Sequence, residues 1–176
     1  MDFLKVDAVH HTYFTKTSAV TALSDVSLKV EEGEFVSFLG PSGCGKTTLL
    51  SIIAGLFEPT EGTVTLEGKR VETAENEIGY MLQQDYLFPW KNIEENILLG
   101  LKIGNSLSPD KKAYALKLLQ EMGLKGVESQ YPKQLSGGMR QRVALVRTLA
   151  TGPKLLMLDE PFSALDYQTK LKLEDL

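Results

Sequence analysis

The chain has 176 residues, of which 43% are hydrophobic and 24% charged, a composition that suits a soluble domain with a full hydrophobic core. Its formal net charge of −4 gives no reason to expect nucleic acid as a partner. The single cysteine excludes an internal disulfide and a cysteine-based metal site, and no apolar run is long enough to span a bilayer. Residues 1–9 contain no signal-peptide core, so we expect a cytoplasmic protein.

Apolar and polar residues alternate in three places in the N-terminal part, over residues 3–9, 26–30 and 63–67. Such alternation predicts half-buried strands, and in the first of them every second residue, Ala8 included, is expected to face the core. Residues 10–19 are polar, and we expect them to form a loop.

Residues 34–39 form a nearly unbroken apolar run that predicts a buried strand, and residues 47–57 have the character of a helix. Between them, residues 40–47 (GPSGCGKT) match the phosphate-binding loop G-x-x-x-x-G-K-[ST]. Lys46 would bridge the β- and γ-phosphates of a nucleoside triphosphate, and the Thr47 hydroxyl would ligate Mg²⁺. A glycine-rich turn with a surface lysine is the alternative, but it does not require the strand before and the helix after. The residues expected to contact the nucleotide are Gly40, Pro41, Ser42, Gly43, Cys44, Gly45, Lys46, Thr47 and Thr48.

The pattern changes from strands to helices near residue 90. A short helix is expected over residues 93–100, with Asn92 as its cap and Glu95 completing a capping box. A longer helix is expected over residues 108–122, because proline occupies its first turn and glycine follows its end. Residues 90–135 are therefore predicted to form a small helical unit.

An apolar strand is expected at residues 155–158 (LLML), directly before Asp159 and Glu160. This is the Walker B arrangement, in which Asp159 would hold Mg²⁺ through water and Glu160 would act as general base on the attacking water. Many surface turns also place two acids after an apolar run, so the phosphate-binding loop upstream is what favours the catalytic interpretation.

The stretch 135–142 (LSGGMRQR) opens a helix expected over residues 137–150. Ser136, Gly137 and Gly138 offer unpaired N–H groups at the helix start, which makes them a candidate anion site. An ordinary N-cap with exposed arginines is the alternative. Because one loop already holds the phosphates of one nucleotide, a second anion site must serve a different face of the protein.

In this order, these motifs resemble those of the nucleotide-binding subunit of ATP-binding-cassette (ABC) transporters, and the resemblance covers essentially the whole chain. LSGGMRQR resembles the signature motif of that family. The resemblance implies ATP as the nucleotide and Gln83 as the Q-loop glutamine, which contacts Mg²⁺ and water. It also implies that residues 163–166 form the D-loop, with Asp166 near the nucleotide, and that Tyr13 stacks on adenine, with Phe14 as the alternative.

The resemblance implies an α/β fold: a P-loop NTPase (RecA-like) core sheet with an N-terminal antiparallel β subdomain and an inserted α-helical subdomain. Residues 1–89 would hold the β subdomain and the Walker A core, and residues 90–135 the helical subdomain. Residues 136–176 would hold the signature helix, the Walker B strand, the D-loop and the start of the next helix. Two such subunits meet head to tail in the family, so the signature of one copy would close over the phosphate-binding loop of the other.

The function implied is ATP hydrolysis to ADP and phosphate that powers an importer. The partners would be transmembrane permease subunits at the cytoplasmic face of the cell membrane and, indirectly, a solute-binding protein. Residues 83–90 (QQDYLFPW) are similar to the Q-loop segment of importers for nitrate, sulfonates and taurine, although Phe88 and Trp90 could simply bury against the helical unit. The alternatives are a soluble ABC ATPase of translation or DNA repair and a nucleotide-binding fragment without turnover. The solute, and whether the dimer has two identical subunits, are left open.

The family's domain is several dozen residues longer and contains a strand ending in a switch histidine, whereas no histidine follows His11 in this sequence. In related folds that strand lies between the Walker A and Walker B strands. We therefore expect a truncated chain whose last core strands are missing, which would leave unpaired sheet edges, low stability and weak ATPase activity.

Overall fold

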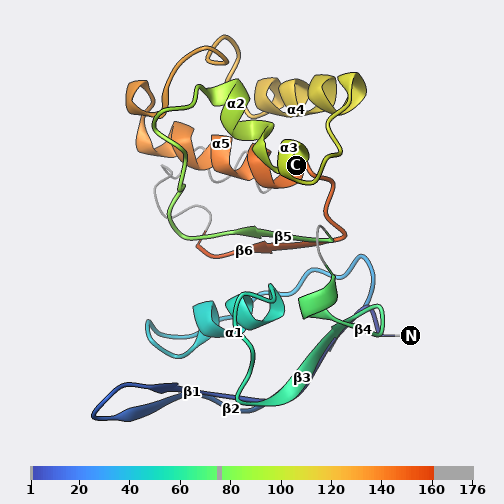
Figure 1. Ribbon diagram of the computed structural model, residues 1–176, viewed down its shortest axis with the longest axis vertical. Coiled ribbons are helices and arrows are strands. Elements are labelled where there is room, and N and C mark those ends of the chain that lie inside the picture. Colours follow the sequence, from blue (N-terminus) through green and yellow to red (C-terminus); the bar gives the residue numbers. More distant parts are fainter. Residues whose placement is uncertain (1, 75–76, 161–176) are drawn as a thin grey trace. The chain divides into compact units, whose positions relative to one another are not determined.

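The computed structural model describes residues 2–74 and 77–160 (Figure 1). The chain divides into two compact units, Met1–Glu75 and Asn76–Leu176. The three-part division expected from the sequence, with boundaries after residues 89 and 135, stays a prediction. Among the described residues, no helix has both the length and the apolar character needed to cross a membrane.

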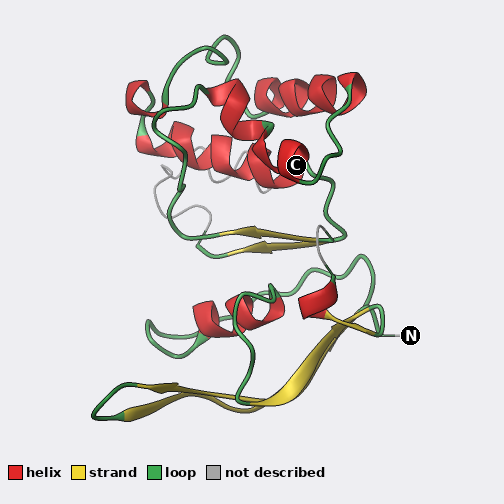
Figure 2. Cartoon of the chain, viewed as in Figure 1, coloured by secondary structure: helices red, strands yellow, loops and turns green. Residues whose placement is uncertain are grey.

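The first unit contains an antiparallel sheet of four strands in the order β2-β1-β3-β4. The strands are β1 (Leu4–Phe14), β2 (Ala19–Val30), β3 (Glu61–Leu66) and β4 (Lys69–Arg70). Helix α1 (Lys46–Ile53) packs along the sheet beside β2 (Figure 2). The three strands expected from alternating residues are therefore present, and they form the antiparallel subdomain that the sequence predicted.

The prediction of a loop at residues 10–19 was wrong, because β1 and β2 extend through most of this segment as a long hairpin. Backbone pairing continues to Phe14 and Ala19, and the hydroxyls of Thr12 and Thr21 lie 3.2 Å apart across the strands. The end of the hairpin is exposed, so no buried face imposes the apolar alternation that identifies a strand in a sequence.

Ala8 does not face the core as the alternation predicted. Its φ is 46°, it is exposed, and Val9 occupies the buried position instead. The pairing register shifts between Val6 and Val9, which is a β-bulge. On the other side of β1, strand β3 carries Gly62 at this point, and a Cβ added to Gly62 would clash with the Ala8 carbonyl.

The apolar segment 34–39 is not a strand, contrary to the prediction. Phe35 and Leu39 are 91% and 93% exposed, and none of the strands assigned in residues 2–74 and 77–160 pairs with the segment. A strand needs hydrogen-bonding neighbours, and an apolar run specifies side chains that suit a sheet without supplying those neighbours. Helix α1 is also shorter than expected, because Gly55 adopts a φ of 72° just after it.

The second unit pairs two parallel strands, β5 (Ile78–Met81) and β6 (Leu155–Leu158), with helices on one face of the pair (Figure 1). The helices are α2 (Ile93–Ile97), α3 (Leu99–Ile103), α4 (Pro109–Glu121) and α5 (Gly137–Leu149). The core side chains that are almost fully buried include Ile93, Ile97, Leu101, Leu119 and Val143.

Helix ends in this unit follow the local signals in the sequence. Asn92 and Glu95 form the expected capping box, with N···O distances of 2.8 and 2.9 Å. Ser108 caps α4, whose first residue is proline. The single helix expected over residues 93–100 is instead two short helices separated at Leu98, where ψ is −2°.

Candidate functional site

The phosphate-binding loop, residues 40–47, enters α1 through a left-handed backbone. Gly43 and Gly45 have φ values of 82° and 96°, and Gly45 is the N-cap of α1. A Cβ on Gly45 would lie 2.7 Å from the Ala22 carbonyl oxygen and 2.9 Å from Leu23 Cδ2, so glycine is required for both conformation and space. Turns of this kind direct successive N–H groups to one side and suit an anion.

The Lys46 ammonium lies within this loop. It donates to the carbonyl oxygens of Gly40 at 2.7 Å and Pro41 at 2.9 Å, and the Cys44 N–H closes a turn onto the Pro41 carbonyl at 3.3 Å. A cation, the start of a helix and a glycine turn thus occupy one loop, and all three attract negative charge. The residues present fit a phosphate chain, and Thr47 is exposed at the helix start, where a hydroxyl can reach a metal ion.

Tyr13 lies against the helix that follows this loop. Its hydroxyl is 3.1 Å from Thr48 Oγ1, and its ring meets His11 edge-on with a centroid distance of 4.6 Å. Phe57 contacts both rings. Phe14, the alternative from the sequence, is 74% exposed. Tyr13 therefore lies beside the helix that follows the phosphate-binding loop, and its stacking on adenine stays a prediction.

Two ends of parallel strands meet in the second unit, and they bring three of the expected site residues together. Gln83 follows β5 and Glu160 follows β6, and Gln83 Nε2 donates to Glu160 Oε2 at 2.8 Å. Asp159 is 5% exposed, and its N–H donates to the Met81 carbonyl at 2.9 Å. An amide and two carboxylates therefore share one edge of the sheet.

Helix α5 begins at the stretch LSGGMRQR. Ser136 is the N-cap, and its Oγ accepts a hydrogen bond from the Met139 N–H at 3.3 Å. The first turn contains no acidic residue, so nothing in it opposes an anion at the helix start. The expected helix and its cap are present, and Ser136 is exposed.

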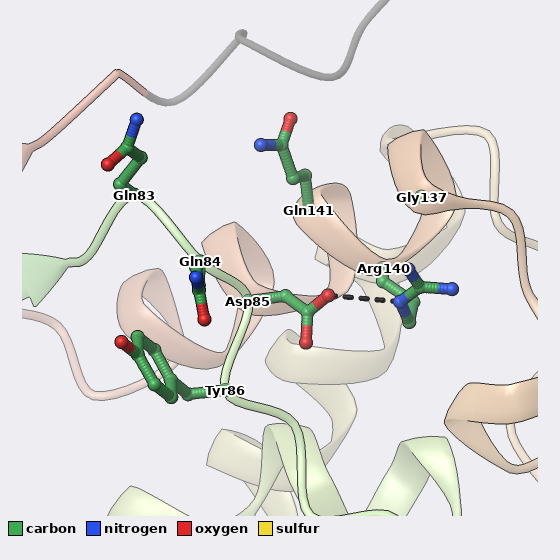
Figure 3. Close-up of a pocket in the computed structure, with 7 residues that line it drawn as sticks. All are labelled: Gln83, Gln84, Asp85, Tyr86, Gly137, Arg140 and Gln141. Carbon is green, nitrogen blue, oxygen red and sulfur yellow. Dashed lines mark hydrogen bonds and ion pairs between the residues drawn. The ribbon is translucent and has the colours of Figure 1, made fainter.

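A hollow of about 400 Å³ lies between the segment after β5 and the start of α5 (Figure 3). Its lining residues are Gln83, Gln84, Asp85, Tyr86, Gly137, Arg140 and Gln141. Asp85 and Arg140 form an ion pair across it at 3.0 Å, drawn as the dashed line in Figure 3. The segment after β5 and the first turn of α5 are thus directly connected.

The expected site residues are divided between the two units, and one of them lies outside the described part of the chain. Lys46 and Thr47 belong to the first unit, and Asp159 and Glu160 belong to the second. Asp166 lies outside the described residues.

Comparison with known proteins decides the family. The profile of the ABC transporter family matches residues 23–163, which is most of the chain.

The chain belongs to the ABC transporter family.

This ABC protein is 66% identical to an uncharacterised ABC transporter ATP-binding protein of Bacillus subtilis strain 168, YtlC, over the whole chain and 68% of that relative. It is 45% identical to the taurine import ATP-binding protein TauB of Escherichia coli K12, over 88% of the chain and 61% of TauB. The ABC chain therefore spans about two thirds of the length of these relatives.

Solved structures agree with the family. The dimeric ABC cassette MJ0796 in a post-hydrolysis state bound to ADP and Pi matches with a TM-score of 0.89 and 35% identity. The match covers 98% of the ABC chain and 80% of that cassette. The chain is an ABC ATPase cassette with the mixed α/β fold of the P-loop NTPases, so the resemblance and the fold class read from the sequence are confirmed.

Asn96 is a buried polar residue of this ABC cassette that the sequence analysis missed. It is 0% exposed, and its Oδ1 accepts from the Phe88 N–H at 2.8 Å. Its Nδ2 lies within 3.2 Å of the carbonyls of Phe88, Lys91 and Asn92. One side chain therefore fixes the loop that carries Trp90. The only sequence signal was an asparagine on the apolar side of a helix.

Asn96→Ala is expected to lower the free energy of unfolding by about 3 kcal/mol, because it leaves a buried N–H and several carbonyls without partners. Urea denaturation followed by circular dichroism measures the change. Gln120→Ala, which removes an exposed amide from α4, is the control and should shift stability by less than about 0.5 kcal/mol. An equal effect of the two substitutions would contradict the structural role of Asn96.

Proposed function

We propose that this protein is the ATP-binding and ATP-hydrolysing subunit of an ABC importer. The observation that carries the proposal is the sheet edge at which Gln83 is hydrogen-bonded to Glu160 beside the buried Asp159. An amide next to two carboxylates can orient a water molecule, accept its proton and bind a divalent cation. Together with the phosphate-binding loop, these groups supply what phosphoryl transfer to water requires.

The phosphate-binding loop would hold the nucleotide through its backbone N–H groups and Lys46. The ammonium would exchange its bonds with Gly40 and Pro41 for bonds to β- and γ-phosphate oxygens, which are stronger acceptors because they are charged. The Thr47 hydroxyl, Gln83 and Asp159 are the proposed ligands of Mg²⁺, directly or through water. When bound, Mg²⁺ neutralises charge that develops on the phosphates.

Glu160 would act as the general base. It accepts a proton from water as the water oxygen attacks the γ-phosphorus, and the bond from that phosphorus to the bridging oxygen of ADP breaks. Gln83 would hold the carboxylate and the water in line through its amide. The products are ADP and phosphate, the two ligands named for the solved ABC cassette similar to this chain.

A second copy would complete the nucleotide site. Ser136, Gly137 and Gly138 are proposed to contact the γ-phosphate held by the partner's loop, because they form a helix start with an exposed N-cap and no acid in its first turn. The structural relative is a dimer, which supports this arrangement. Asp166 is proposed to lie near the same interface, and Tyr13 to stack on adenine.

The permease is the other proposed partner, at the cytoplasmic face of the membrane. Trp90 is 70% exposed and meets Phe88 edge-on at 5.2 Å, so it is not buried against the helices of its own unit. An exposed tryptophan on a fixed loop suits a protein interface. The likeness to TauB, a taurine import ATP-binding protein, supports an importer. The solute that we propose is taurine, another sulfonate, nitrate or a similar small molecule, delivered by a solute-binding protein.

The test is phosphate release by the protein assembled with its permease in vesicles that contain the solute-binding protein. We expect Mg²⁺-dependent hydrolysis that rises when taurine or nitrate is added to the binding protein. A rate of hydrolysis that no solute of this class changes would contradict the importer assignment. The absence of any hydrolysis would contradict the ATPase assignment.

Cys44 gives an independent check on nucleotide binding. It is exposed in the loop and is the only cysteine of the chain, so a maleimide labels one position. We expect ATP with Mg²⁺ to slow labelling roughly tenfold when its concentration is ten times its Kd. Cys44→Ala should take no label. Labelled protein that binds ATP with unchanged affinity would contradict the placement of the phosphates.

A further inference from the structure

Two arginines of α5 hold the loop that follows Gln83. Arg140 and Arg147 are seven residues apart, about two helical turns, and so lie on one face of the helix. Arg140 Nε donates to Asp85 Oδ2 at 3.0 Å. Arg147 donates through Nη2 to the Asp85 carbonyl at 2.7 Å and through Nη1 to the Tyr86 carbonyl at 2.9 Å.

The loop after Gln83 contains an unfavourable backbone conformation. Tyr86 has a φ of 42°, in the left-handed region that large side chains avoid. The guanidinium of Arg147 bridges two successive carbonyls at this point, and Asp85 Oδ1 also accepts the Leu87 N–H at 3.1 Å. Burial lowers the pKa of Arg147, and the Asp85 charge opposes that shift, as expected for a guanidinium enclosed by protein.

We propose that Arg140 and Arg147 are positioning residues that fix the loop 85–87 on α5 and thereby hold the Gln83 amide on Glu160. Gln83 lies two residues before Asp85, so the anchored segment sets where its side chain can reach. The same helix begins at Ser136. One rigid element thus carries both the signature end and the anchor of the Q-loop, and this inference rests on the catalytic roles proposed for Gln83 and Glu160.

The proposal separates turnover from ATP binding. Among the described residues, the partners of the arginine pair are Asp85, Tyr86 and Leu135, which belong to the second unit, whereas the proposed phosphate ligands at residues 40–48 belong to the first. Loosening the loop should therefore lower kcat and leave KM for ATP nearly unchanged. A misplacement of about 1 Å in a catalytic group costs up to roughly a hundredfold in rate.

The first experiment measures kcat and KM in Arg147→Met and Arg147→Lys. We expect Arg147→Met to lower kcat by about tenfold to a hundredfold, with KM changed less than about threefold. Arg147→Lys should lie between it and the wild type, because an ammonium keeps the charge but cannot bridge two carbonyls as a guanidinium does. An unchanged kcat, or KM rising in proportion to the loss of kcat, would overturn the proposal.

The second experiment uses hydrogen exchange and does not depend on turnover. Peptides that cover residues 82–88 should exchange faster in Arg147→Met, while peptides from residues 40–53 should not change. Arg142→Met is the matched control on the same helix, since Arg142 donates to Gly138 and Met122 instead of the loop. Exchange over residues 82–88 that is equal in both variants would overturn the proposal.

A charge exchange tests the remaining ion pair. Asp85→Arg and Arg140→Asp should each lower kcat, and the double variant should recover part of it, because the pair is re-formed with its charges reversed while the bond from the Leu87 N–H stays lost. Failure of the double variant to recover would reject the role of this pair. If the wild-type protein hydrolyses no ATP, the proposed function fails. The hydrogen-exchange experiment still decides in that case whether Arg147 fixes the loop.

Discussion

Glu160→Gln is expected to lower kcat for ATP hydrolysis by roughly 10²–10⁴-fold, the usual contribution of a general base, while ATP binding persists. Glutamine has nearly the same shape, and its Oε1 can still accept the hydrogen bond from Gln83, which the glutamate accepts at 2.8 Å. It cannot take a proton from water, so only the chemical step is affected.

The measurement is single-turnover phosphate release beside equilibrium binding of a fluorescent ATP analogue. Glu121→Gln is the matched control, because this glutamate is exposed on α4 and forms an ion pair with Lys117 of the same helix. It should match the wild type in both assays. Wild-type hydrolysis by Glu160→Gln would show that another group, or no protein group, acts as the base.

Lys46→Ala is expected to weaken ATP binding by about two orders of magnitude. The ammonium can donate to two phosphate oxygens, and hydrogen bonds to charged groups contribute about 1.5–3 kcal/mol each, which corresponds to a loss of a hundredfold or more. Isothermal titration calorimetry with ATP and Mg²⁺ measures the change. In the structure the same ammonium donates to the Gly40 and Pro41 carbonyls, so the substitution could also change stability. The thermal unfolding temperature of Lys46→Ala should therefore be measured beside its affinity for ATP.

Lys29→Ala provides the control for loss of a positive charge in the first unit. Lys29 is exposed on β2, eleven residues before the phosphate-binding loop, and pairs with Asp2 at 2.9 Å. Its substitution should change the affinity for ATP by less than about twofold, as is usual for exposed ion pairs. Equal affinities of Lys46→Ala and the wild type would reject the phosphate-binding role of the loop.

Features set by neighbouring residues could be predicted from the sequence. The capping box of Asn92 and Glu95 and the cap at Ser136 depend on groups three residues apart, so their signals are complete in a short stretch. Gly43 and Gly45 of the phosphate-binding loop are local in the same sense, because their positive φ values alone make a side chain unfavourable at these positions.

Features that depend on distant partners could not be predicted in this way. Segment 34–39 has the composition of a buried strand but lacks a paired neighbour in the part of the chain that the structure describes. The contact between Gln83 and Glu160 joins residues 77 positions apart, and only the parallel pairing of β5 with β6 brings them together. The structural role of Asn96 could not be predicted, because its partners are backbone groups, which every residue of a sequence supplies.

We propose that two copies of this ABC ATPase close over ATP, each completing the other's site. Sedimentation velocity of the Glu160→Gln protein with ATP and Mg²⁺ measures this association, because ATP that is not hydrolysed should keep the copies together. We predict a dimer with ATP, monomers with ADP, and loss of the dimer when Ser136→Arg is added. A protein that stays monomeric at saturating ATP, or dimerises equally without nucleotide, would contradict the claim.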